Sequence, residues 1–68
     1  MPLYNRLKEY RAKNGINQSE MGRLVGVSRQ TISLIERGDY FPSVVLAIKI
    51  ARYFNVSVED IFDFKEEE

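Results

Sequence analysis

Residues 18–37 read QSEMGRLVGVSRQTISLIER. Apolar residues recur at helical spacing in two segments, which predicts one helix over residues 18–25 and a second over 28–37. Gly26 lies between them, where a tight turn needs the left-handed backbone conformation that glycine adopts without strain. Gly22 falls where the helices cross, and only a small side chain fits there. The apolar positions expected to face a shared core are Met21, Val25, Val27, Ile32 and Ile35.

The second helix of this pair has an outward polar face made of Ser28, Arg29, Gln30, Thr31 and Ser33. In the major groove, arginine can bond bidentately to guanine O6 and N7, and glutamine to adenine N6 and N7. The sequence therefore predicts a helix-turn-helix arrangement whose second helix reads base edges, with Arg29 and Gln30 as the first readers and Thr31 and Ser33 as secondary ones. The alternative is that Arg29 or Gln30 contacts only a phosphate.

Composition excludes several classes of site. The chain has 68 residues and contains neither cysteine nor histidine, so disulfides and the usual zinc ligand sets are excluded, and we expect no metal and no other cofactor. An enzyme is disfavoured because no pair of acids is expected to share a core pocket. No apolar run reaches the roughly 20 residues of a membrane span, and no signal peptide is visible, so we expect a cytoplasmic protein with one domain over residues 1–68.

Charge is unevenly distributed along the chain, although ten basic and ten acidic residues cancel overall. Residues 1–54 contain nine Lys/Arg and four Asp/Glu, a net of +5, whereas residues 55–68 contain one and six, a net of −5. A basic body is the electrostatic footprint expected of a nucleic-acid-binding protein. The acidic C-terminal tail, residues 63–68, is expected to be frayed and to face away from DNA.

The remaining segments predict three more helices, over residues 3–14, 44–54 and 58–62, and no sheet, because no period-2 alternation of useful length occurs. Helix starts are expected where an N-cap residue precedes an apolar pattern, at Asn17, Ser28, Ser43 and Ser57. The first helix should bury Leu3, Leu7 and Tyr10. The fourth should bury the face formed by Val44, Ala47, Ile48, Ala51 and Phe54. The chain is therefore predicted to be all-α, a compact five-helix bundle.

Three runs of sequence carry a resemblance to a known family: residues 16–38, INQSEMGRLVGVSRQTISLIERG; Pro42-Ser43; and residues 49–62, KIARYFNVSVEDIF. Together they resemble the phage repressor/Cro-type (XRE) helix-turn-helix domains over residues 6–62. The matching features are Gln18, the small residue Gly22, Gly26 in the turn, the Ile-Glu-x-Gly of residues 35–38, and Ile50-Ala51. Among the departures, Gly22 replaces the commoner alanine, which should cost about 1 kcal/mol of helix propensity. Leu34 and Val45 are apolar where the family often has polar groups.

The resemblance implies a lambda-repressor-like bundle that binds double-stranded DNA as a homodimer and regulates transcription, most often as a repressor. Its operator would be pseudo-palindromic, with half-sites about 34 Å apart. An antitoxin or another protein-interaction module with the same fold, with a toxin as its partner, is the alternative. A bundle that kept the fold without binding DNA is a further one.

The resemblance also implies roles for residues outside the reader helix. Gln18 and the N–H groups at the start of its helix would clamp a phosphate, unless Gln18 is a simple helix-start residue. Contacts with the DNA backbone could be added by Arg11, Arg23, Arg37 and Lys8, for each of which a solvated surface charge is the alternative. Arg11 would also form a partly buried ion pair with Glu36 and lock the reader helix against the first helix. Dimerisation would use the aromatic residues Tyr40, Phe41, Phe62 and Phe64, for which local core capping is the alternative.

Overall fold

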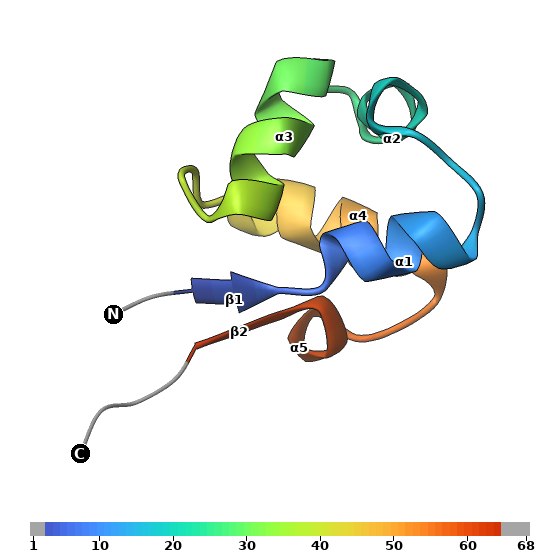
Figure 1. Ribbon diagram of the computed structural model, residues 1–68. Helices are drawn as coiled ribbons and strands as arrows, with labels where there is room; N and C mark the ends of the chain where they lie inside the picture. The colour runs from blue at the N-terminus through green and yellow to red at the C-terminus, as the bar shows by residue number, and fades with distance from the viewer. Residues whose placement is uncertain (1–2, 65–68) are drawn as a thin grey trace.

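The computed structural model describes residues 3–64, which form five helices and a two-stranded sheet (Figure 1). In chain order these are β1 (Leu3–Asn5), α1 (Leu7–Lys13), α2 (Gln18–Val25), α3 (Arg29–Arg37), α4 (Val44–Phe54), α5 (Val58–Ile61) and β2 (Phe62–Phe64). The predicted bundle of five helices is confirmed. Figure 1 shows α2 beside the start of α3, on the side of the molecule opposite the two strands. Residues 65–68 of the acidic tail lie outside the described residues.

Polar caps determine where four of the helices begin, as the sequence predicted. Asn17 and Glu20 form a reciprocal capping box, with Glu20 N–H donating to Asn17 Oδ1 at 2.9 Å and Asn17 N–H donating to Glu20 Oε1 at 3.0 Å. Ser28, Ser43 and Ser57 each accept a backbone N–H three residues further on. Each such cap contributes about 1 kcal/mol by satisfying a helix N–H that has no partner inside the helix.

The predictions of a first helix over residues 3–14 and of no sheet were wrong. Residues 3–5 form a strand that pairs antiparallel with β2, in the register Leu3 with Phe64 and Asn5 with Phe62. Asn5 ends the strand: its Nδ2 donates to the carbonyl of Ile35 at 2.8 Å, and its Oδ1 accepts the N–H of Leu7 at 3.2 Å. Strands of three residues are too short for alternation to be visible, and the partner strand lies at the other end of the chain.

The core contains apolar residues from all five helices and from β2, namely Leu7, Met21, Val25, Ile32, Ile35, Leu46, Ala47, Ile50, Ala51, Ile61 and Phe62. The rings of Tyr10 and Phe54 lie 5.5 Å apart and pack α1 against the end of α4. Phe62 is only 8% exposed, so the expectation that it lies at a dimer interface was wrong. Its position directly after α5 turns it inward beside Ile61, which is fully buried.

The predicted buried face of α4 was partly wrong. Ala47 and Ala51 are buried and Phe54 is partly buried, but Val44 and Ile48 are 76% and 41% exposed. Leu46 and Ile50 occupy the core instead. The first five residues of α4, VVLAI, are all apolar, so two different faces satisfied helical spacing and the sequence could not distinguish them.

Gly22 allows α2 and the start of α3 to approach backbone to backbone. Its carbonyl accepts the N–H groups of both Gly26 and Val27, each at 2.8 Å. A Cβ at this position would lie 2.5 Å from the carbonyl oxygen of Val27 and 3.3 Å from the amide nitrogen of Arg29. The helix-propensity cost of this glycine is therefore offset by a close approach that would have to shift to accommodate the methyl group of an alanine.

We expect Gly22→Ala to lower the melting temperature. Alanine gains about 1 kcal/mol of helix propensity, but its methyl group meets a backbone oxygen that cannot rotate away, and such overpacking costs about 1–3 kcal/mol. Thermal unfolding followed by circular dichroism measures the balance. Arg23→Ala, at an exposed position of the same helix, is the control and should melt close to the parent. A Gly22→Ala chain that melts higher than the parent would contradict the close approach.

Candidate nucleic-acid interface

Helix α3 is held by one side and exposes the other. Ile32 and Ile35 are fully buried and fasten the helix to the core. At its start, Ser28 Oγ accepts the N–H of Thr31 at 3.1 Å and lies 3.0 Å from the Thr31 hydroxyl oxygen. The two buried isoleucines and the Ser28 cap fix the rotation of α3 about its axis and the position of its first turn. The outward side chains of α3 are therefore presented on a rigid element.

A shallow hollow runs along the outward side of α3, lined by Arg29, Gln30, Ser33, Leu34 and Arg37. These residues lie on successive turns, so the strip is about 12 Å long at 1.5 Å per residue. We call it the α3 strip. It brings together three of the five expected base readers. The other two, Ser28 and Thr31, lie at the N-terminal end of the helix, where their hydroxyl groups also serve the cap.

Leu34 was not among the expected DNA contacts, although it is apolar where the family often has a polar group. Its half-buried side chain adds an apolar surface to the α3 strip. Arg37 was expected to contact phosphate and lies at the far end of the strip. There its Nε is 3.3 Å from Asp39 Oδ2, in a pair whose side chains are 62% and 60% exposed.

The start of α2 presents N–H groups to solvent. The capping box satisfies those of Asn17 and Glu20. Within residues 3–64, the N–H groups of Gln18 and Ser19 have no hydrogen-bond acceptor. Free N–H groups at a helix N-terminus carry partial positive charge and attract anions.

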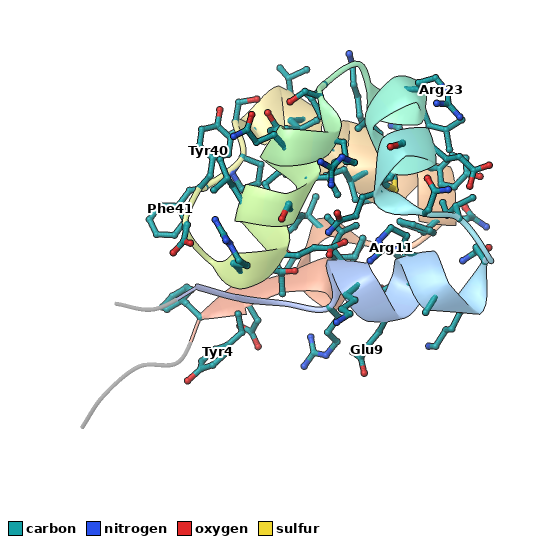
Figure 2. All side chains as sticks on the ribbon, turned by 45° about the horizontal axis from the view of Figure 1, so that its top comes forward. Tyr4, Glu9, Arg11, Arg23, Tyr40 and Phe41 are labelled. Atoms are coloured by element: carbon teal, nitrogen blue, oxygen red, sulfur yellow. The ribbon has the colours of Figure 1, made fainter. Side chains whose placement is uncertain are left out.

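The ion pair between Arg11 and Glu36 is present and largely buried. Arg11 Nε donates to Glu36 Oε2 at 2.8 Å and Nη2 to Oε1 at 3.2 Å, and the side chains are 14% and 7% exposed. Arg11 Nη1 donates to the carbonyl of Ile16 at 3.1 Å. All three guanidinium nitrogens are therefore engaged within the protein, and Figure 2 shows Arg11 reaching inward from α1. Arg11 therefore stabilises the fold, and we propose no direct phosphate contact for it.

Glu36 has a second partner that was not predicted from the sequence. Gln18 Nε2 donates to Glu36 Oε1 at 3.0 Å, so one carboxylate joins α1, the start of α2 and the end of α3. No sequence pattern links residues 18 positions apart in this way. The remaining predicted phosphate residue, Arg23, is exposed on the outer side of α2 (Figure 2).

Exposed apolar side chains gather where α3 is joined to α4. Tyr40 and Phe41 project from this loop (Figure 2), and Phe41 is 61% exposed. They are followed by Val44, Val45 and Ile48 on the solvent side of α4. We call these five residues the loop patch. Phe64 is also exposed, but it lies in β2 beside Tyr4 and Arg6.

No helix in residues 3–64 is long and apolar enough to cross a membrane. Nor do these residues contain a group of three or more acidic, histidine or cysteine side chains that could hold a metal ion.

Comparison with known proteins gives matches along most of the chain. The helix-turn-helix family model matches residues 7–61. An uncharacterized HTH-type transcriptional regulator of Archaeoglobus fulgidus is 56% identical over 66 residues, covering 97% of this chain and 93% of that protein. The uncharacterized HTH-type transcriptional regulator YgzD of Bacillus subtilis is 49% identical over 65 residues, covering 96% and 98%.

Solved structures with the same arrangement include two regulators. The P22 c2 repressor, crystallised with a synthetic operator, aligns with a TM-score of 0.76 and 30% identity, over 79% of this chain and 82% of that one. The restriction-modification controller protein C.AhdI of Aeromonas hydrophila aligns with a TM-score of 0.74 and 29% identity, over 81% and 83%. Both similarities extend over more than the two central helices.

Proposed function

Because this chain belongs to the helix-turn-helix family of transcriptional regulators, we propose that it binds double-stranded DNA as a homodimer and inserts α3 of each copy into the major groove. The observation that carries the proposal is the α3 strip: polar side chains able to bond base edges lie on a helix whose other face is locked into the core. The similarity to a repressor crystallised with its operator supports this use of the fold.

For the α3 strip and the residues at the start of α3, the proposed roles follow from side-chain chemistry. Arg29 and Gln30 are exposed near the start of the helix and suit bidentate contacts with guanine and adenine. Ser33, Thr31 and Ser28 can each make a single hydrogen bond to a base or to the backbone. Leu34 suits an apolar contact such as the methyl group of thymine. Occupying an operator in this way would block polymerase, so we propose repression as the mode of regulation.

Phosphate contacts would set the register of the protein on the duplex. Gln18 lies at the start of α2, where its own N–H and that of Ser19 are free to bind an anion. Arg23 and Arg37 are exposed and can add contacts from the outer side of α2 and from the end of α3. These contacts supply affinity without reading sequence, and they make binding dependent on salt.

The loop patch is the proposed dimer interface, and its occupant is a second copy of this chain. Its five members are uncharged, so a two-fold arrangement that apposes the patch with itself brings no like charges together. The patch begins within three residues of the end of α3, so pairing there would hold two reader helices in a defined relation. A chain of this size gains needed stability from such burial. Phe64 is a second, isolated candidate contact.

The experiment that tests the proposed function is a duplex titration at several salt concentrations, with the stoichiometry measured by analytical ultracentrifugation. With about six phosphate contacts per dimer, we expect affinity to fall by about 10³ between roughly 50 and 200 mM salt. Two chains should be bound per operator duplex. Absence of binding at the lowest salt would contradict DNA recognition. A single chain on DNA, and a monomer at high concentration, would contradict the homodimer and favour another protein, such as a toxin, as the partner of the loop patch.

A further inference from the structure

Glu36 connects the stability of the fold to the proposed phosphate contact, because its carboxylate binds Gln18 as well as Arg11. Oε1 accepts from Gln18 Nε2 at 3.0 Å and from Arg11 Nη2 at 3.2 Å, while Oε2 accepts from Arg11 Nε at 2.8 Å. The Glu36 side chain is 7% exposed, whereas Gln18 is only half-buried at the molecular surface. The nearly buried carboxylate of Glu36 therefore binds the terminal amide of a side chain at the surface.

We propose that Glu36 is a positioning residue for DNA binding, which acts by holding the Gln18 side chain ready for a phosphate. A primary amide has two N–H donors, and Glu36 occupies one of them. Within residues 3–64 the second N–H has no acceptor and can donate to a phosphate oxygen, as can the backbone N–H groups of Gln18 and Ser19, which also lack one. This inference rests on the proposed function, since it specifies how one phosphate contact is made.

Holding Gln18 in advance lowers the entropy lost on binding. A free glutamine side chain at the surface samples many rotamers, and ordering it at the interface opposes association. Here the rotamer is selected in the free protein by a hydrogen bond to a charged acceptor, which is stronger than one between neutral groups. The same residue that locks α3 against α1 therefore also orders the start of α2.

Arg11 makes this arrangement compatible with an anionic ligand. A lone carboxylate beside a phosphate would repel it, and the repulsion would be strong because Glu36 is largely shielded from water. Arg11 neutralises Glu36 from the inner side. Each of its three guanidinium nitrogens already donates within the protein, so it contributes to phosphate binding through Glu36 and not by direct contact.

A thermodynamic cycle tests the proposal. The four chains are the parent, Gln18→Ala, the double variant Arg11→Met with Glu36→Met, and the triple variant. Replacing a buried ion pair by apolar residues of similar volume commonly preserves stability. The double variant removes one positive and one negative charge, so the net charge is unchanged. Affinity for a single duplex is then compared at one salt concentration.

In the parent we expect Gln18→Ala to weaken binding of the dimer about a hundredfold, because each of the two copies loses one hydrogen bond to a charged group, worth about tenfold. In the double variant, where Gln18 has lost its acceptor, the same substitution should weaken binding by less than about twofold. The double variant alone should already bind about a hundredfold more weakly than the parent. An equal loss from Gln18→Ala in both backgrounds, or no loss in either, would overturn the proposal.

A second measurement uses the parent chain alone, without DNA and without any variant. The heteronuclear NOE of the Gln18 side-chain amide reports its motion in the free parent chain. We expect this amide to be as rigid as the backbone of α2, unlike the side-chain amide of Gln30, which is exposed on α3 and serves as the internal control. A mobile Gln18 amide would overturn the positioning role. Failure of the parent to bind any duplex would instead count against the proposed function.

Discussion

Glu36→Ala is expected to destabilise the chain by about 3–5 kcal/mol, the typical cost of removing one partner from a buried pair. The Arg11 guanidinium would keep its charge at 14% exposure without the carboxylate that bound two of its nitrogens. Gln18 would lose its acceptor as well. A domain of this size has only about 3–5 kcal/mol of net stability, so much of the population should be unfolded at room temperature. Urea and thermal unfolding followed by circular dichroism measure the loss.

The exposed pair between Arg37 and Asp39 provides the matched control for Glu36→Ala. Both of its side chains are more than half exposed, and such pairs contribute about 0–1 kcal/mol. Asp39→Ala should therefore melt close to the parent. If Glu36→Ala melted with the parent too, the ion pair would not lock α3 to α1, and the rigidity of the α3 strip would need another cause.

Arg29→Ala is expected to have the largest effect on recognition. Each bidentate contact with guanine is worth about 1–3 kcal/mol of discrimination, so its loss from both half-sites should weaken operator binding by about 2–6 kcal/mol. Binding to unrelated duplexes should change much less, because it depends on phosphate contacts. The operator is first obtained by selection from random duplexes, and affinities for it and for a scrambled duplex are then measured by titration.

Arg23→Ala is the control for Arg29→Ala, because both remove one exposed positive charge. Arg23 lies on the outer side of α2, away from the α3 strip. Its substitution should therefore weaken binding to the operator and to the scrambled duplex to a similar extent. Equal losses on both duplexes for Arg29→Ala would assign Arg29 to phosphate and leave base reading to Gln30 and its neighbours.

Most of the helical framework could be predicted because it is encoded locally. Asn17, Ser28, Ser43 and Ser57 each precede an apolar pattern, and each caps the helix that the pattern indicated. Gly26 has the expected positive φ of 84°. Capping and turn conformation depend on residues within one helical turn, so a single sequence contains the information they need.

The errors concern contacts between distant residues. The pairing of β1 with β2 joins the two ends of the chain over three residues, and nothing in Leu3–Asn5 alone indicates its partner. The orientation of α4 was ambiguous because Val44 to Ile48 are all apolar. Phe62 was read as a surface aromatic although the end of α5 turns it into the core. In each case the tertiary environment decided between local patterns that the sequence allowed equally.

The residues of the candidate site likewise fall into those predictable from a local pattern and those brought together by distant contacts. Arg29, Gln30 and Ser33 could be chosen from chemistry and helical spacing, and the α3 strip contains all three. The pair between Arg11 and Glu36 was implied only by the family resemblance, since 25 residues separate them. Neither the helical pattern nor the family resemblance predicted the hydrogen bond from Gln18 to the same carboxylate, because it depends on the crossing of three helices.

The proposed recognition of DNA requires that the start of α3 contacts the bases of a duplex. The most direct test is to add the selected operator to the ¹⁵N-labelled chain and map the backbone amide shifts onto the structure. We predict that the largest changes occur at residues 28–33 and at Gln18 and Ser19, while the amides of α5 remain close to their free positions. Changes concentrated on α4 and α5, with residues 28–33 unaffected, would contradict the account.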